Sequence, residues 1–246
     1  MITLFNVSKK FVIPDKKRRS LFKNISRAVK GQYTNKTIWA LDKVSIDIGK
    51  GEMIGIIGPN GSGKSTLLRI IGDIYRPTSG VVKVKGEVTP VLQLDDGFLP
   101  DLSLKDNVFL FGAIMGLDRG EIARNFSRMI DFAELNEFVN ATVRTLSLGM
   151  KERLAFSVII EAYKDILLFD EIFAIGDQRF REKCFGAVEK MKREGKTILF
   201  SSHDLDLIRR FCDRVLLLNQ GRVASVGDAE TAITEYMYLV KARGEG

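Results

Sequence analysis

A glycine-rich stretch at residues 58–66 carries the clearest chemical pattern in the chain. It follows the apolar run Met53–Ile57 and opens a segment with helical spacing, which is the strand–loop–helix setting of a phosphate-binding loop. Glycines let backbone N–H groups curve around an anion, and a helix start adds partial positive charge. We expect Lys64 to reach the β- and γ-phosphates of a nucleotide and Ser65 to ligate Mg²⁺. The residues assigned to this phosphate site are Gly58, Asn60, Gly61, Ser62, Gly63, Lys64, Ser65 and Thr66.

Two acids follow a second apolar run, and the single histidine follows a third. Asp170 and Glu171 come directly after Ile166–Phe169, and His203 comes shortly after Thr197–Phe200. A sheet of parallel strands places its ligands at the carboxyl ends of those strands. We therefore expect Asp170 to hold Mg²⁺, Glu171 to act as the general base on a water molecule, and His203 to contact the γ-phosphate rather than to be a plain packing residue.

The elements that position these residues are short apolar runs alternating with helical segments. The runs do not alternate apolar with polar residues, which is typical of strands buried on both faces of a mostly parallel sheet. The four runs are 54–57, 166–169, 197–200 and 215–218. The predicted helices are 64–71, 120–133, 148–163, 178–194 and 228–241. The pattern predicts an α/β fold with a P-loop NTPase core.

Residues 102–163 lack strand-like runs. We interpret this segment as a helical subdomain inserted into a single domain that spans residues 1–246.

Composition and charge limit the class of protein. The 246 residues are 45% hydrophobic and 28% charged, which is typical of a globular chain with a full core. The two cysteines do not make a disulfide framework, so we expect buried thiols in a reducing compartment. No apolar run reaches the roughly 18 residues that span a bilayer, and the N-terminus lacks the apolar core of a signal peptide. These features predict a cytoplasmic protein.

The net charge of +7 is concentrated near the N-terminus. The segment 14–36 is basic, and Leu21, Phe22, Ile25 and Val29 can share one helical stripe. We predict an amphipathic helix there, whose residues 16–23 lie against an anionic membrane surface or against the pyrophosphate group of a substrate. A solvated surface loop is the alternative.

With these motifs in place, the chain resembles the ATP-binding domain of ABC transporters over almost its whole length. Residues 146–150 resemble the family's signature, usually Leu-Ser-Gly-Gly-Gln: Ser147 and Gly149 match it, whereas Leu148 and Met150 depart. The resemblance implies an ABC ATPase fold that includes an antiparallel β portion. It also implies a homodimer in which Ser147 and Gly149 bind the γ-phosphate of ATP held by the opposite copy. Ser147 can in addition be a helix N-cap.

The resemblance assigns three further positions. Gln93 resembles the glutamine that senses Mg²⁺ and links to the transmembrane partner, and Asp177 resembles the aspartate at the subunit contact. Phe11 stands where the family usually has the aromatic residue that stacks on adenine, with Trp39 as the alternative.

Within the family, the chain is most similar to exporters of lipid-linked polysaccharides such as O-antigen, capsule and teichoic acid. The similarity lies in the additional segment 14–36 and in residues 93–98, 149–156 and 174–184. The sequence ends at Gly246 without the C-terminal carbohydrate-binding domain of some O-antigen exporters, which implies export that needs no terminal sugar cap. The implied cofactors are ATP and Mg²⁺. The implied partners are an integral-membrane permease and a lipid-linked glycan, at the cytoplasmic face of the membrane, with no nucleic acid.

Two other functions use the same nucleotide chemistry. One is the ATPase of a small-molecule or lipid transporter, against which the segment 14–36 argues. The other is a soluble ABC ATPase that acts on nucleic acid or ribosomes, as the basic charge would allow. The single phosphate loop and the short interval between Ser65 and Leu146 argue against the second.

Overall fold

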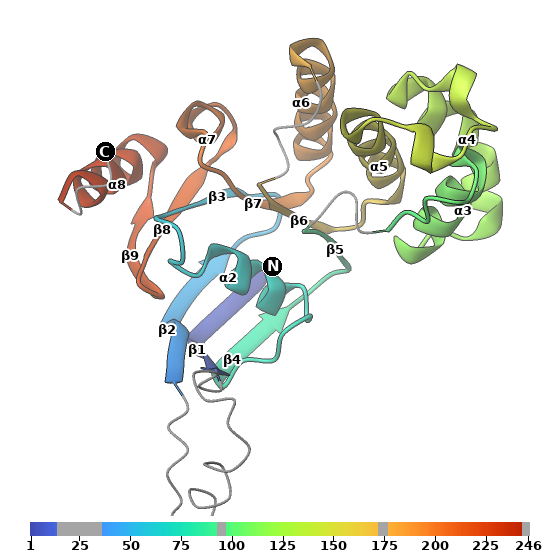
Figure 1. The fold of residues 1–246 in the computed structure, drawn as a ribbon. Helices are drawn as coiled ribbons and strands as arrows, with labels where there is room; N and C mark the ends of the chain where they lie inside the picture. Colours follow the sequence, from blue (N-terminus) through green and yellow to red (C-terminus); the bar gives the residue numbers. More distant parts are fainter. Residues whose placement is uncertain (14–35, 93–96, 172–176, 243–246) are drawn as a thin grey trace, which may run out of the picture.

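The structure is a computed structural model that describes residues 1–13, 36–92, 97–171 and 177–242. The described residues form two β-sheets flanked by α-helices (Figure 1). The predicted basic helix at 14–36 lies outside these ranges, apart from Lys36, and so does Gln93.

The larger sheet has six strands and carries the phosphate loop. Its neighbouring strands are parallel from β5 to β8, and β9 is antiparallel at one edge. In spatial order the strands are β5 (Val88–Val91), β6 (Ile166–Asp170), β7 (Thr197–Ser201), β3 (Met53–Ile57), β8 (Arg214–Asn219) and β9 (Arg222–Gly227). All four apolar runs that we predict to be strands belong to this sheet, which confirms the mostly parallel arrangement.

The smaller sheet is antiparallel, as the resemblance implies. In spatial order its strands are β2 (Lys36–Ile48), β1 (Ile2–Ile13) and β4 (Ser79–Val84). The pairing of β1 with β2 shifts register three times between Leu4 and Lys10. Such irregularities change which residues share a face, because consecutive strand residues point to opposite sides.

The five parallel strands of the larger sheet each contribute to two separate hydrophobic cores. Leu167 belongs to the core that includes residues of helices α5 to α8, whereas its neighbour Leu168 belongs to the core that includes residues of β1, β2 and α2. Figure 1 shows the same layers, with α6, α7 and α8 on one face of the sheet and α2 with the smaller sheet on the other. Burial of both faces explains why the strands appear in the sequence as continuous apolar runs.

The helices in the described ranges are α2 (Lys64–Ile71), α3 (Leu104–Ile114), α4 (Arg119–Ala133), α5 (Leu148–Ala162), α6 (Gln178–Arg193), α7 (Leu205–Phe211) and α8 (Ala229–Ala242). All of them except α3 and α7, for which the sequence predicts no bounds, begin and end within one residue of the predicted bounds. Side chains define several starts: Ser103 accepts a bond from the Asp106 N–H, and Asp118 with Glu121 forms a capping box. None of the helices in the described ranges is both long and apolar enough to cross a bilayer.

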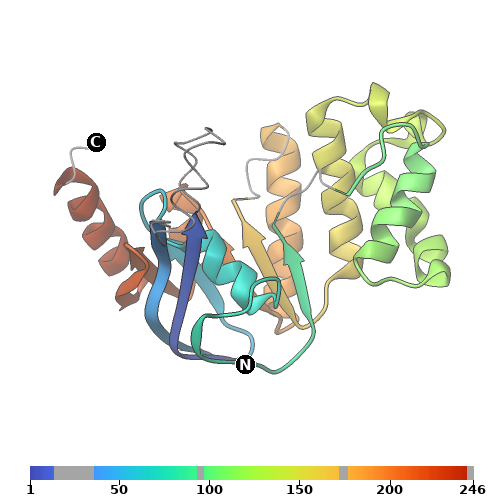
Figure 2. The same ribbon diagram turned by 60° about the horizontal axis from the view of Figure 1, so that its bottom comes forward.

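Helices α3, α4 and α5 stand together beside the larger sheet (Figures 1 and 2). Phe109 of α3 stacks on Phe126 of α4 with centroids 6.1 Å apart, and Phe132 of α4 stacks on Phe156 of α5 at 6.2 Å. These three helices all come from the segment 102–163. That they form an inserted subdomain remains our interpretation.

The two cysteines are free thiols, as predicted. Cys184 is buried and Cys212 is half-buried. Burial raises the pKa of the Cys184 thiol to about 12 and raises that of Cys212 as well, so both thiols are protonated and poorly reactive at neutral pH.

Candidate active site

The phosphate loop joins the buried strand β3 to the start of α2. Its glycines adopt positive φ angles, 149° at Gly58 and 109° at Gly63. No side chain caps the start of α2, and its first turn holds no acidic residue. The N–H groups at this helix start are therefore directed at a site with no competing carboxylate of the same turn, which suits an anion.

Backbone groups press on the loop from two sides and leave room only for glycine. A Cβ at Gly58 would lie 2.1 Å from the carbonyl oxygen of Leu218, and one at Gly63 would lie 2.5 Å from that of Ala40. The Gly221 N–H also donates to the Ser62 carbonyl at 3.0 Å. The loop is thus held in shape by β2, by β8 and by the turn that follows β8.

Lys64 folds back over the loop that precedes it. Its Nζ donates to the carbonyl oxygens of Gly58 at 2.8 Å and Pro59 at 3.4 Å, and the residue is 6% exposed. Burial lowers the pKa of Lys64, and the negative charges of Glu171 and Asp170 partly offset that effect. The ammonium group therefore lies within the field of both acids.

Ser62 supplies a second polar group in the loop. It is 3% exposed, and among the described residues its Oγ has no hydrogen-bond partner. A buried hydroxyl without a partner is rare in folded proteins. Together with the Lys64 ammonium and the N–H groups of α2, this donor set fits a polyphosphate.

Asp170 and Glu171 lie at the carboxyl end of β6, beside the end of β7. Asp170 accepts a hydrogen bond from Ser201 Oγ at 2.6 Å, and Glu171 Oε1 lies 3.0 Å from His203 Nε2. Glu171 has a φ of 58°, in the left-handed region that costs a residue with a side chain about 1–2 kcal/mol. Its N–H donates to the Ser201 carbonyl at 3.2 Å. The structure therefore brings the predicted base and the predicted histidine together.

The groups assigned to Mg²⁺ are few. Ser65 and Asp170 are both half-buried. Within the described ranges, no three His, Cys, Asp or Glu side chains form a metal-binding group. Mg²⁺ that binds with a nucleotide usually takes one or two carboxylates together with phosphate oxygens and water, so a hydroxyl and one carboxylate fit that pattern.

Ser147 and Gly149 lie at the start of α5, away from the loop. The Ser147 side chain caps the helix by accepting a bond from the Met150 N–H at 3.3 Å, so the predicted N-cap is present. Ser147 is exposed, and its neighbour Leu148 is 61% exposed. Figures 1 and 2 show α5 apart from α2, so these groups do not complete the phosphate site of their own chain.

The strand register separates the two candidate aromatic residues. Phe11 pairs with Ile38, and Lys10 pairs with Trp39, so the two rings lie on opposite faces of the β1–β2 pair. Lys9 shares the Phe11 face, because its Nζ is 5.2 Å from the Phe11 centroid, and Lys9 pairs with Leu41. Leu41 is buried against the loop, where a Cβ at Gly63 would meet it at 2.7 Å. Phe11, rather than Trp39, is therefore on the side of the loop.

Asp177 begins α6. Its carboxylate accepts a bond from the Phe180 N–H at 2.9 Å and pairs with the Arg153 guanidinium. The Phe180 N–H, followed by Arg153, lowers the pKa of Asp177, so it stays ionised at neutral pH. The residue is exposed and lies six positions beyond Glu171 in the sequence.

Sequence reasoning missed Ser201 and the backbone conformation of Glu171. Ser201 ends β7 two residues before His203, so the strand-end argument that selects His203 could also have selected it. No sequence signal marks the left-handed conformation of Glu171, because it arises where the chain leaves β6 and bonds back to β7.

Comparisons with known proteins agree with this geometry. The sequence pattern of the family described as "ABC transporter" matches residues 41–174. The O-antigen export system ATP-binding protein RfbB of Klebsiella pneumoniae is 41% identical over 197 residues, 80% of this chain and 80% of that protein. The teichoic acids export ATP-binding protein TagH of Bacillus cereus is 35% identical over 239 residues, 96% of this chain but 42% of that protein.

A solved structure shares the fold. The dimeric post-hydrolysis state of the ATP-binding cassette MJ0796, bound to ADP and Pi, superposes with a TM-score of 0.73 at 26% identity. The match covers 93% of this chain and 99% of that one.

Replacing Gly63 by alanine tests how tightly the loop is held. Gly63→Ala adds both a strained φ and a Cβ against the Ala40 carbonyl, so we expect a loss of about 3 kcal/mol in the free energy of unfolding. Gly61→Ala is the matched control, because its φ of 73° is strained but a Cβ meets nothing within 4 Å; we expect a loss of about 1 kcal/mol. Urea denaturation measures both, and equal losses would contradict the packing described here.

Proposed function

The chain belongs to the ABC transporter family, and we propose that it is the ATP-hydrolysing subunit that powers export of a lipid-linked polysaccharide across the cytoplasmic membrane. As a member of this family it is an ATPase. The observation that carries the proposal is the phosphate loop with Lys64 in the field of Asp170 and Glu171, and with Glu171 paired to His203. The named relatives serve O-antigen and teichoic acid export, which favours a glycan cargo over nucleic acid.

The proposed nucleotide site is built from the loop outward. The triphosphate lies on the N–H groups of the loop and the start of α2, with Lys64 at the β- and γ-phosphates. Asn60, Gly61, Ser62 and Thr66 complete the cradle. Ser65, Asp170 and Gln93 would hold Mg²⁺, which would supply positive charge against the phosphates. The adenine stacks on Phe11, whose ring lies on the side of the loop.

Glu171 and His203 would carry the chemical step. A Glu171 carboxylate oxygen accepts a proton from the water that attacks the γ-phosphorus, and the bond from that phosphorus to the bridging oxygen breaks. His203 donates to the γ-phosphate oxygens. Because Glu171 and His203 are 3.0 Å apart, both side chains reach one region at the ends of β6 and β7.

A second copy would complete the site. Ser147 and Gly149 are exposed or half-buried at the start of a fifteen-residue helix, and they stand away from the loop of their own chain. In a head-to-tail pair they close on the γ-phosphate held by the other copy, where Asp177 also meets the partner. A separate integral-membrane permease converts closing and opening of this homodimer into movement of the lipid-linked glycan.

Replacing Glu171 by glutamine separates binding from hydrolysis. We expect Glu171→Gln to bind ATP with Mg²⁺, to lose at least about 100-fold in turnover, and to remain dimeric with ATP. Lys64→Ala is expected to lose nucleotide binding. Phosphate release and sedimentation velocity measure these outcomes, and a Glu171→Gln protein that is monomeric when saturated with ATP would contradict the shared site.

Recovery of partners with the tagged Glu171→Gln protein tests the export function. From detergent-solubilised native membranes we expect an integral-membrane protein of several spans together with a polyprenyl-linked glycan, identified by mass spectrometry. Ribosomes or DNA without a membrane protein would end the transporter proposal and leave the ATPase intact.

The two aromatic residues offer a matched pair of variants. Base stacking contributes about 1–3 kcal/mol, so Phe11→Ala should weaken ATP binding by about fivefold to 150-fold. Trp39→Ala, on the opposite face, should leave the affinity unchanged. Equilibrium titration with ATP under non-hydrolysing conditions decides between them, and the reverse result would assign the base to Trp39.

The basic segment 14–36 would hold the subunit against the cytoplasmic face of the membrane. Each cation near an anionic surface contributes on the order of 1 kcal/mol, so replacing Lys16, Lys17, Arg18 and Arg19 by glutamine should weaken binding to anionic vesicles at least tenfold. ATP hydrolysis by the isolated subunit should not change, whereas export should fall. Unchanged vesicle binding and export would leave the segment as a solvated loop.

A further inference from the structure

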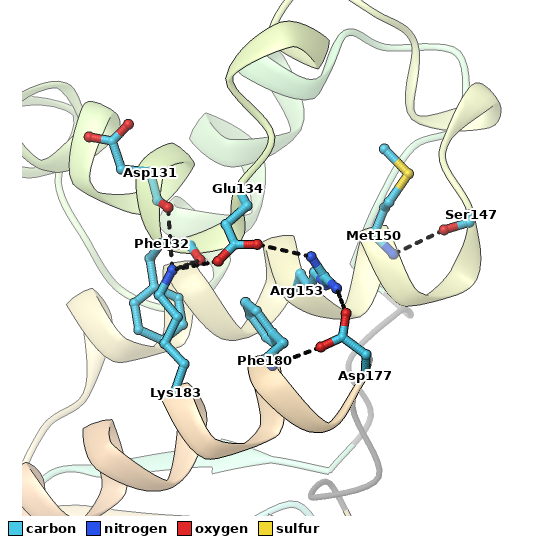
Figure 3. A network of polar contacts seen from close by, with 9 residues as sticks. All are labelled: Asp131, Phe132, Glu134, Ser147, Met150, Arg153, Asp177, Phe180 and Lys183. Carbon is cyan, nitrogen blue, oxygen red and sulfur yellow. Dashed lines mark hydrogen bonds and ion pairs between the residues drawn. The ribbon is translucent and has the colours of Figure 1, made fainter.

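Three helices meet around the carboxylate of Glu134, which lies directly after α4 (Figure 3). Its Oε2 lies 3.4 Å from an Arg153 guanidinium nitrogen on α5, and its Oε1 lies 3.3 Å from Lys183 Nζ on α6. One carboxylate therefore bridges cations from two other helices. In both ribbon views α5 stands between α6 and the pair α3 and α4.

Glu134 occupies a backbone conformation that suits glycine. It is the C-cap of α4, with φ 60° and ψ 42° in the left-handed region. Glycine is the residue that helices most often place in this conformation, because a Cβ is unfavourable there. A glutamate in this position strains the backbone, which glycine would not. The side chain of Glu134 is therefore not needed for the turn that ends α4, and its contacts with Arg153 and Lys183 call for another explanation.

The two cations bind further groups at the junction. Arg153 is mostly buried, and it also pairs with Asp177, the N-cap of α6. Lys183 donates to the Phe132 carbonyl at 2.8 Å, at the carboxyl end of α4 where a cation is favourable. The bridge therefore joins the end of α4, the body of α5 and the start of α6.

Aromatic rings from the same three helices lie beneath the charges. Phe132 of α4 stacks on Phe156 of α5, and it meets Phe180 of α6 edge-on with centroids 5.7 Å apart. The Arg153 guanidinium lies 4.8 Å above the Phe180 ring, and Lys183 Nζ lies 4.7 Å from the Phe132 ring. Charge and ring contacts together restrict how α5 and α6 can shift against each other.

In the proposed homodimer, both ends that this junction connects would face the second copy. Ser147 lies six residues before Arg153, at the start of α5, and Asp177 is bonded directly to Arg153 at the start of α6. We propose that Glu134 is a positioning residue for the pairing of two copies: it fixes the signature serine and Asp177 relative to each other, so that both meet the partner at once. This inference rests on the proposed ATP-driven homodimer.

Replacing Glu134 by glycine separates positioning from stability, since the backbone conformation favours glycine. In the Glu171→Gln background, we expect Glu134→Gly to keep or raise the melting temperature and to keep the ATP affinity measured at dilutions where the protein is monomeric. The dissociation constant of the ATP-bound dimer should rise at least fivefold. Glu134→Gln, which keeps the side-chain shape and removes the charge, should have the same effect on the dimer.

Glu161→Gln is the matched control. Glu161 pairs with Arg128 at 2.8 Å and so also joins α4 to α5, but near the opposite end of α5 from Ser147. We expect the dissociation constant of its ATP-bound dimer to equal that of the Glu171→Gln parent.

Equal dissociation constants for Glu134→Gly and the parent would overturn the inference and leave the proposed function intact. A lowered melting temperature together with weaker dimerisation would also overturn it, because the residue would then only support the fold. A parent that does not dimerise with ATP would instead contradict the proposed function.

Discussion

The phosphate loop packs so closely against the carbonyl groups of Leu218 and Ala40 that Gly58 and Gly63 have no room for a side chain. The other parts of the site depend on this close contact, because it fixes the loop in place. The two carbonyls belong to different sheets, so the loop is also a place where the larger and smaller sheets meet. A loop confined in this way holds its N–H groups ready for an anion without first having to order itself, which is how a preorganised site gains affinity. The contact also fixes β1 and β2, and with them Phe11, relative to the loop.

Strand order then determines which side chains surround the loop. Strand β7 lies between β3 and β6, and all three run in the same direction, so their carboxyl ends open on one edge. Glu171 and His203 meet at that edge, and Lys64, which follows β3, lies within the field of Glu171. Burial lowers the pKa of the Lys64 ammonium, and the negative charges of Glu171 and Asp170 partly offset that effect, so the acids favour the charged form of the lysine before any ligand enters.

Much of this arrangement could be predicted from the sequence because it rests on local patterns. Apolar runs identify the central strands, and the glycine spacing identifies the loop. The location of Glu171 and His203 at one edge follows from the carboxyl ends of parallel strands. Other features depend on contacts between distant segments. The register shifts of β1 that turn Phe11 towards the loop and the bridge made by Glu134 leave no periodic trace in the sequence.

The start of α5 has an apolar side chain beside Ser147, the serine that we propose binds the γ-phosphate of the other copy. Leu148 is 61% exposed where the family usually has glycine. If closure of the homodimer covers this side chain, apolar surface leaves water at each of the two sites. Burial of apolar surface has a negative heat-capacity change, and the free energy it contributes becomes more favourable with warming near room temperature. The temperature dependence of assembly in this protein would then differ from that of a relative with glycine there, even though the phosphate contacts are the same.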